Sequence, residues 1–499
     1  MPSKIVRNVH HLLLCIASNE ALYLFVAFLS QFLRGLGPLY WYQPALNSIY
    51  TYIAVPWGSA LCLLRLERRV QNPIEEKRPD LAALAALLVW IVLPFAYRFG
   101  LSVNNVTSWY NHFVVFFGLY ALITEDSAEH RARLLDCVGG LFAALSFVLG
   151  SLALLCVVRV QGYGVGIGEY PFGIYTNDML YLGAYYNMSG IVALCCGLLA
   201  LIGVFRRKSW PARLLHLIPA LMMMAVVVLT QSRTARYSML VALALGCYGA
   251  LASGLPVKRR ALRQVTALLA AALVLTVGYT GARELTDAAL AHFASVRAAN
   301  AAALTPLHQE IDAQEPTIAA DSTPSEFDDN PSVTGEDLGV QPTQQREAFN
   351  FSFQGRTEIW NSLFSLWKQE PKFMLMGYGM GNTGMRLRST LLPDALTVEL
   401  HNSYLQFAAD YGLIGFALLG AFLLMAAVQW LHVFFAPKEF AQGGDRVLCM
   451  LVAAMLIFGL MESSALGAMQ PVNLVLFFAL ALITARGREL CAAQNRSKG

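Results

Sequence analysis

Charged residues are scarce in this chain. Only 14% of its 499 residues are charged, whereas 57% are hydrophobic. A soluble protein carries roughly 25% charged residues, so the composition excludes an ordinary soluble domain. The apolar runs are about 20 residues long and do not alternate with polar residues, which indicates membrane-spanning helices rather than the strands of a barrel.

Motifs for metal, nucleotide and disulfide chemistry are also missing. Outside the apolar runs there is no H-E-x-x-H, no D-x-D and no Cys/His cluster, so we expect metal-independent chemistry and no cofactor. Gly377–Asn382 is rich in glycine, but no G-K-[ST] follows, which favours a turn of closely approaching backbones over a phosphate loop. No cysteine falls within the long polar segment, which argues against an external disulfide framework.

The apolar runs predict an all-α polytopic membrane protein with about twelve transmembrane helices. Helices 1–9 occupy residues 1–281, one large loop occupies 282–408, and helices 10–12 with the C-terminal tail occupy 409–499. The predicted spans are 11–33, 45–64, 81–100, 109–124, 134–158, 178–204, 212–230, 237–253, 264–281, 409–436, 447–466 and 470–485.

Lys and Arg are distributed unevenly among the segments that connect successive predicted spans. The short connections on one side hold few cations, namely Arg34, Arg98, Arg159, Arg233 and Arg236. The other side holds most of the rest, including Arg65, Arg68, Arg69, Arg131, Arg133, Arg206, Arg207, Lys258, Arg259, Arg486 and Arg488. Because Lys and Arg remain on the cytoplasmic side, both termini are predicted to be cytoplasmic. The large loop then faces the periplasm of a bacterial inner membrane.

This periplasmic loop has two parts of different composition. Residues 298–347 are rich in Ala, Pro, Thr and acidic residues, which is typical of a flexible acidic insert that buries no core. Residues 349–408 are predicted to be the ordered helical part. Apolar residues at 356–368 recur at helical spacing, and we expect this helix to lie along the membrane interface through Trp360 and Trp367.

His401 is the first candidate for chemistry, because it lies where this loop meets the next apolar run. A neutral imidazole accepts a proton from a hydroxyl nucleophile near pH 7. An interfacial histidine that contacts lipid is the alternative at this point. Asn402 either orients a sugar or caps the following helix, and capping is the commoner use.

The outer-side arginines are the second candidate group. The planar guanidinium suits phosphate oxygens, so a cluster at the outer leaflet would hold a lipid-linked diphosphate, with Arg356, Arg386 and Arg388 nearby in the loop. The alternative is that each arginine reaches phospholipid head groups or pairs with an acid. The acids Glu20, Asp178 and Glu462 suit the proton relay of a transporter, but isolated acids are more often packed polar contacts.

Four stretches then occur in order along the chain. They are Phe172–Asp178, Thr230–Thr234, Gly355–Trp360 followed by Gly377–Asn382, and His401–Leu405 followed by Gly412–Gly415. Together they resemble motifs of the O-antigen ligase and O-antigen polymerase superfamily of bacterial envelopes. The acidic insert is not part of that pattern.

The resemblance implies a C-type glycosyltransferase (GT-C) fold and a glycan donor on undecaprenyl diphosphate. It implies that His401 acts on the acceptor hydroxyl and that Arg233 and Arg356 contact the diphosphate. Weaker candidates for the diphosphate are Arg34, Arg98, Arg159 and Arg236, and supporting candidates are Asn177, Asn402, Tyr404 and Gly379.

The expected activity is that of an O-antigen ligase, which moves the glycan to a lipid A-core hydroxyl with inversion. Expected partners are the donor, this acceptor and membrane lipids, without nucleic acid. A polymerase of the same superfamily and a protein O-oligosaccharyltransferase share the donor and the chemistry. A polytopic transporter or flippase is the alternative from another class.

Overall fold

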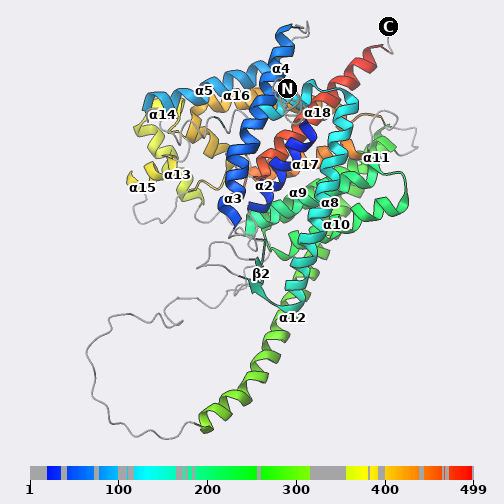
Figure 1. Ribbon diagram of the computed structural model, residues 1–499, viewed down its shortest axis with the longest axis vertical. Helices are drawn as coiled ribbons and strands as arrows, with labels where there is room; N and C mark the ends of the chain where they lie inside the picture. Colours follow the sequence, from blue (N-terminus) through cyan, green and yellow to red (C-terminus); the bar gives the residue numbers. More distant parts are fainter. Residues whose placement is uncertain are drawn as a thin grey trace, which may run out of the picture.

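The apolar runs of the sequence form helices whose buried faces pack into one bundle (Figure 1). The computed structural model describes residues 19–34, 42–71, 78–98, 110, 117–163, 172–174, 178–182, 186–254, 260–314, 356–379, 382–390, 399–437, 443–463, 466 and 471–496.

The helices follow one another with short connections over most of the chain. The N-terminal half contains α2 (Glu20–Arg34), α3 (Gln43–Ile49), the π-helical η2 (Tyr50–Ala54), α4 (Val55–Gln71), α5 (Pro79–Arg98), α7 (Leu119–Glu125), α8 (Ala128–Arg159), α9 (Tyr186–Arg206), α10 (Trp210–Leu229) and α11 (Arg233–Gly254). The C-terminal half contains α12 (Arg260–Gln314), α13 (Arg356–Gln369), α14 (Pro371–Met376), α15 (Asn382–Thr390), α16 (Ser403–Phe434), α17 (Gly443–Gly459) and α18 (Pro471–Arg496).

Six helices of the described residues are long and apolar enough to cross a membrane, so the chain is a multi-pass membrane protein. They are α8 to α12 and α16, and α2 and α5 contain shorter apolar stretches. In the most apolar 18-residue stretch of each helix, 78% is buried in α9 and 11% in α12. Helix α9 is therefore central, and α12 lies at the edge of the bundle. The fold class is therefore confirmed in its coarse form, while the number of twelve spans stays a prediction.

A small antiparallel sheet departs from the all-α expectation. It has the order β1 (Gly162–Tyr163), β2 (Phe172–Ile174) and β3 (Leu180–Leu182), with Phe172 opposite Leu182. The span predicted at 178–204 therefore begins in a strand, and α9 starts only at Tyr186. Strands of three residues are too short to show an alternating pattern in the sequence.

Helix α12 is longer than its predicted span. It continues past residue 281 without a break to Gln314, so the predicted insert at 298–347 begins inside a helix and its remainder lies outside the described residues. Figure 1 shows this helix extending beyond the rest of the bundle. His292 Nε2 lies 3.0 Å from the Val158 carbonyl oxygen and Arg297 pairs with Asp178 at 2.6 Å, which fastens the extension to the end of α8 and to the sheet.

Ion pairs connect several helices at one end of the bundle. Asp80 at the start of α5 accepts hydrogen bonds from Tyr120 (2.9 Å) and Arg78, and it pairs with Arg488 at 2.5 Å. At the last residue of α9, Arg206 donates to Asp136 at 2.6 Å. The charge pattern predicts that these arginines are cytoplasmic, which would place the opposite end of α9 on the other side of the membrane.

The loop helices α13, α14 and α15 pack on the start of α16 through a second apolar cluster, which contains Leu363, Leu366, Trp367, Phe373, Tyr378, Leu387, Leu400, Ala408 and Ala409. The predicted helix at 356–368 is confirmed as α13. Its tryptophans pack within the protein, because Trp367 is buried in this cluster and Trp360 Nε1 donates to the Leu400 carbonyl at 2.7 Å. The position of this helix along the membrane interface stays a prediction.

The glycine-rich turn after α14 fits closely against a kink in α16. Tyr378 N donates to Ala409 O at 2.9 Å, and Gly379 N donates to Asp410 O at 2.8 Å. At Gly377 (φ 84°) an added Cβ would lie 2.2 Å from Asp410 O, and at Gly412 (φ 74°) it would lie 2.0 Å from Leu375 O. Both positions exclude a side chain, which confirms the interpretation of 377–379 as a turn where two backbones approach.

Candidate active site

A fully buried carboxylate, Glu462, lies at the end of the bundle opposite Arg206 and Asp136. It stands in the connection between α17 and α18, with 0% of its side chain exposed. Asn187 Nδ2 donates to its Oε1 at 2.6 Å, and Arg356 Nη2 lies 3.3 Å from the same oxygen. A buried charge is stable only when such donors compensate for the lost water. Glu462 therefore brings together α9, the start of α13 and the connection before α18.

His401 is the third side chain at this carboxylate. Its Nδ1 lies 3.7 Å from Glu462 Oε2, and 40% of its side chain is exposed. We call Asn187, Arg356, His401, Ser403 and Glu462 the Glu462 cluster. The ring thus has one nitrogen directed toward a buried acid, while much of its surface is open to a ligand.

The backbone around His401 is fixed on both sides. His401 itself has φ 47°, a left-handed conformation that costs a non-glycine residue about 1–2 kcal/mol. On one side, Leu400 O accepts from Trp360. On the other, Asn402 caps α16 by accepting from Tyr404 N and Leu405 N at 3.0 Å each. The predicted cap is therefore confirmed, and the surrounding contacts hold the strained turn in place.

Two further bonds connect this turn to the Glu462 connection. Asn402 Nδ2 donates to Leu460 O at 3.0 Å, and Ser403 Oγ donates to the backbone oxygen of Glu462. The segments that carry the imidazole and the carboxylate are therefore held together by these two side-chain-to-backbone hydrogen bonds. A change in one segment will displace the other.

Asn187 is oriented by the loop between α10 and α11. Ser232 caps α11, because its Oγ accepts from Ala235 N at 3.2 Å, and the same hydroxyl donates to Asn187 Oδ1 at 2.8 Å. The amide oxygen of Asn187 is thus an acceptor and its Nδ2 must face Glu462. The Thr230–Thr234 motif consequently acts on the site through Asn187.

The arginines predicted to bind phosphate have different surroundings. Arg356, 23% exposed, belongs to the Glu462 cluster, and Arg233 is the partly buried first residue of α11, next to Ser232. Arg236 is only 1% exposed and donates to Val228 O and Thr286 Oγ1. The structure therefore places Arg236 as a buried link between α10, α11 and α12, away from the cluster's contacts.

Of the remaining candidates, Arg159, Tyr404 and Gly379 have their described contacts elsewhere in the protein. Arg159 is exposed at the last position of α8. Arg34 and Arg98 are the last residues of α2 and α5, and their side chains are not among those that the structure describes. Asn177 lies outside the described residues. Tyr404 donates to Leu456 O at 2.8 Å, and Gly379 forms the turn already described. The hydrogen bond from Arg386 to Glu370 raises the pKa of that guanidinium, so this arginine is engaged within the loop.

Residues 218–420 match a family model described as O-antigen ligase. The chain carries an O-antigen ligase family domain. No curated protein matches the chain. The family comprises O-antigen ligases and polymerases that use lipid-linked glycans, so the resemblance of the motifs is confirmed at this level.

The O-antigen ligase domain contains some members of the Glu462 cluster and not others. Arg233, Arg356 and His401 lie within residues 218–420, whereas Asn187 and Glu462 lie before and after them. In the sequence, Glu462 is recognisable only as an isolated acid, and no pattern marks Asn187 as part of the site. The only available signal was the presence of an acid at the outer end of an apolar span.

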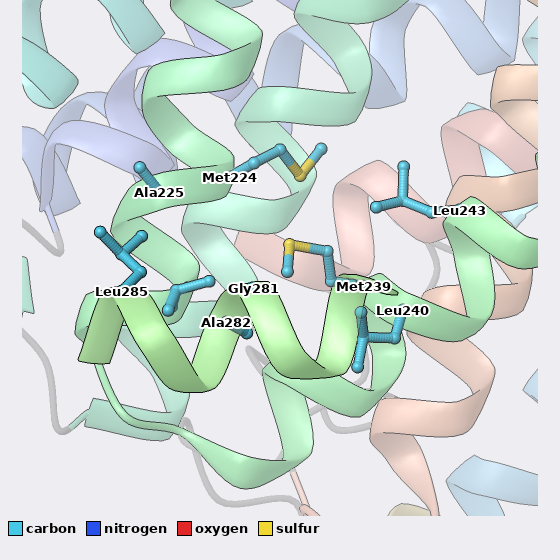
Figure 2. Close-up of a pocket in the computed structure, with 10 residues that line it drawn as sticks. Met224, Ala225, Met239, Leu240, Leu243, Gly281, Ala282 and Leu285 are labelled. Atoms are coloured by element: carbon cyan, nitrogen blue, oxygen red, sulfur yellow. The ribbon is translucent and has the colours of Figure 1, made fainter. Parts of the chain in front are cut away.

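An apolar groove opens among α10, α11 and α12 of the ligase domain (Figure 2). Its volume is about 260 Å³, and its lining is formed by Met224, Ala225, Val228, Met239, Leu240, Leu243, Gly278, Gly281, Ala282 and Leu285. These side chains offer hydrocarbon and thioether surface and no charge. The groove suits an alkyl chain and contains no group for acid-base chemistry.

Among the described residues, one group has the atoms to hold a metal ion. Glu20, Asp126 and His130 place their ligand atoms within 4.8 Å of one another. His130 lies 3.4 Å from Glu20 and 3.7 Å from Asp126, so direct contacts between the ring and the two carboxylates also account for the arrangement. The Asp126 carbonyl accepts from Arg131, which pairs with Glu489 on α18, so this group lies at the same end of the bundle as Arg488.

Proposed function

We propose that this protein is an O-antigen ligase that moves a glycan from undecaprenyl diphosphate to a hydroxyl of lipid A-core, without a metal ion. The observation that carries the proposal is the convergence of His401, Arg356 and Glu462 in one partly open cluster of a ligase-family domain. It combines a proton acceptor with a cation for a phosphate leaving group.

The transfer requires one proton movement. The acceptor hydroxyl attacks the anomeric carbon, a new C–O bond forms, and the bond from this carbon to the diphosphate oxygen breaks. His401 takes the hydroxyl proton through Nε2, the nitrogen that does not face Glu462. Undecaprenyl diphosphate leaves with the bonding electrons, and attack from the opposite face inverts the anomeric carbon.

The charge that develops on the diphosphate needs cations. Arg356 and His401 both contact Glu462. Arg233 lies beside Ser232, which is connected to Glu462 by two hydrogen bonds through Asn187. Guanidinium groups bind phosphate oxygens in a bidentate manner. These two arginines therefore take the diphosphate, while the apolar groove beside α12 offers surface for hydrocarbon.

The proposed topology has twelve spans, with both termini in the cytoplasm. The separation of the polar groups supports opposite sides of the membrane for the two ends of α9, because Asn187 near its start belongs to the Glu462 cluster and Arg206 at its end pairs with Asp136. The cluster then faces the periplasm, where the flipped donor and the acceptor meet.

The product that accumulates in a deletion strain tests this assignment. Loss of a ligase leaves free polymer beside uncapped lipid A-core. Single repeat units on the core would instead indicate a polymerase, and unglycosylated pilin or secreted protein would indicate a protein O-oligosaccharyltransferase. Normal glycan structures together with a transport defect would indicate a transporter and contradict the proposal.

A further inference from the structure

One oxygen of Glu462 and one nitrogen of His401 remain without a hydrogen bond among the described residues. These atoms are Glu462 Oε2 and His401 Nδ1, and both are shielded from solvent. They lie 3.7 Å apart, which exceeds a hydrogen bond but stays within ion-pair range. Two shielded polar atoms that face each other are costly unless they bond, and a small rotation of the ring closes the gap.

We propose that Glu462 is a positioning residue that accepts a hydrogen bond from His401 Nδ1–H and so leaves Nε2 free as the base. This inference rests on the proposed function, because it concerns the same transfer. Which ring nitrogen carries the proton is set by the bond that the other nitrogen makes. A histidine held by a carboxylate at Nδ1 is fixed in both tautomer and orientation.

The other contacts of Glu462 leave only Oε2 for this purpose. Oε1 already accepts from Asn187 Nδ2 at 2.6 Å and from Arg356 Nη2 at 3.3 Å. The Asn187 amide has a single orientation, because Ser232 Oγ donates to its oxygen at 2.8 Å. The carboxylate therefore cannot turn without breaking these bonds, and Oε2 stays directed at the imidazole.

The same arrangement predicts what a neutral side chain does at this position. In Glu462→Gln, the amide oxygen takes the Oε1 position, where Asn187 and Arg356 require an acceptor. The amide NH2 then faces His401 and donates to Nδ1, which forces the proton onto Nε2. The variant keeps the shape of the site but presents the wrong tautomer to the acceptor hydroxyl.

Two measurements on full-length protein in lipid vesicles test the inference. In wild-type protein, nitrogen NMR of labelled histidine, with the His401 signal assigned by its loss in His401→Ala, should show the Nδ1–H tautomer. In Glu462→Gln, kcat should fall by about 10²–10⁴-fold while KM for donor and acceptor changes little. Glu462→Asp should regain part of kcat, and Glu129→Gln, the same change at an exposed position of α8, should retain full activity.

An Nε2–H tautomer in wild-type protein overturns the inference, even if the glutamine variant does not fold. A wild-type kcat in folded Glu462→Gln, or an effect on KM alone, also overturns it. These outcomes differ from a failure of the proposed function, in which His401→Ala itself would keep full transfer.

Discussion

Replacing Gly412 with alanine should separate the loop helices from α16. Gly412 has φ 74°, which costs a residue with a Cβ about 1–2 kcal/mol. The added Cβ would lie 2.0 Å from Leu375 O, so the two backbones must move apart. This weakens the bonds of Tyr378 N and Gly379 N, each worth about 0.5–1.5 kcal/mol. We expect a loss of about 2–5 kcal/mol in docking free energy, and reduced transfer because docking places Arg356 beside His401.

Gly420→Ala is the matched control on the same helix. Nothing lies within 4 Å of a Cβ at Gly420, and alanine there should be neutral or stabilising by up to about 1 kcal/mol. The measurements are the melting temperature of purified protein in detergent and the transfer rate in vesicles. Equal melting temperatures and rates for the two variants would refute the close backbone contact as the element that holds the loop.

Four further outcomes are expected. Arg236→Ala should lower the melting temperature, because it removes donors buried against Val228 O, at a cost of about 2–5 kcal/mol. Arg233→Ala should instead keep the melting temperature and raise KM for the donor about 10–100-fold, because one charge-assisted hydrogen bond to the donor is lost. A lower melting temperature for Arg233→Ala together with a raised KM for Arg236→Ala would contradict both assignments. Excess EDTA should leave transfer in vesicles unchanged, and a loss that Mg²⁺ restores would contradict metal-independent chemistry. Deletion of residues 316–345 should preserve transfer, and inactivity of the folded deletion protein would show that the insert takes part.

Much of the site was visible in the sequence because its signals are local. His401 stands at the junction of a polar segment and an apolar run, and an Asn directly before such a run is a standard helix cap. The amphipathic spacing after Arg356 likewise gave α13 within one residue of its end. These features depend on neighbours in sequence, which a single chain displays fully.

The partners of His401 could not be predicted, because they come from distant connections. Glu462 follows α17 and Asn187 begins α9, and only the packing of these helices brings them together. Arg233 and Arg236 carry the same charge in one motif, yet one is partly open and the other is buried against α12. Burial of this kind depends on the position of α12, which no residue of the motif encodes.

The most direct test of the account compares wild-type protein with His401→Ala in reconstituted vesicles. The measurement is the rate at which glycan on undecaprenyl diphosphate reaches lipid A-core, at equal protein amounts and with melting temperatures checked. The account predicts a fall of at least about 100-fold, the contribution of a positioned base. A rate equal to that of the wild type would contradict the assignment of this cluster as the active site.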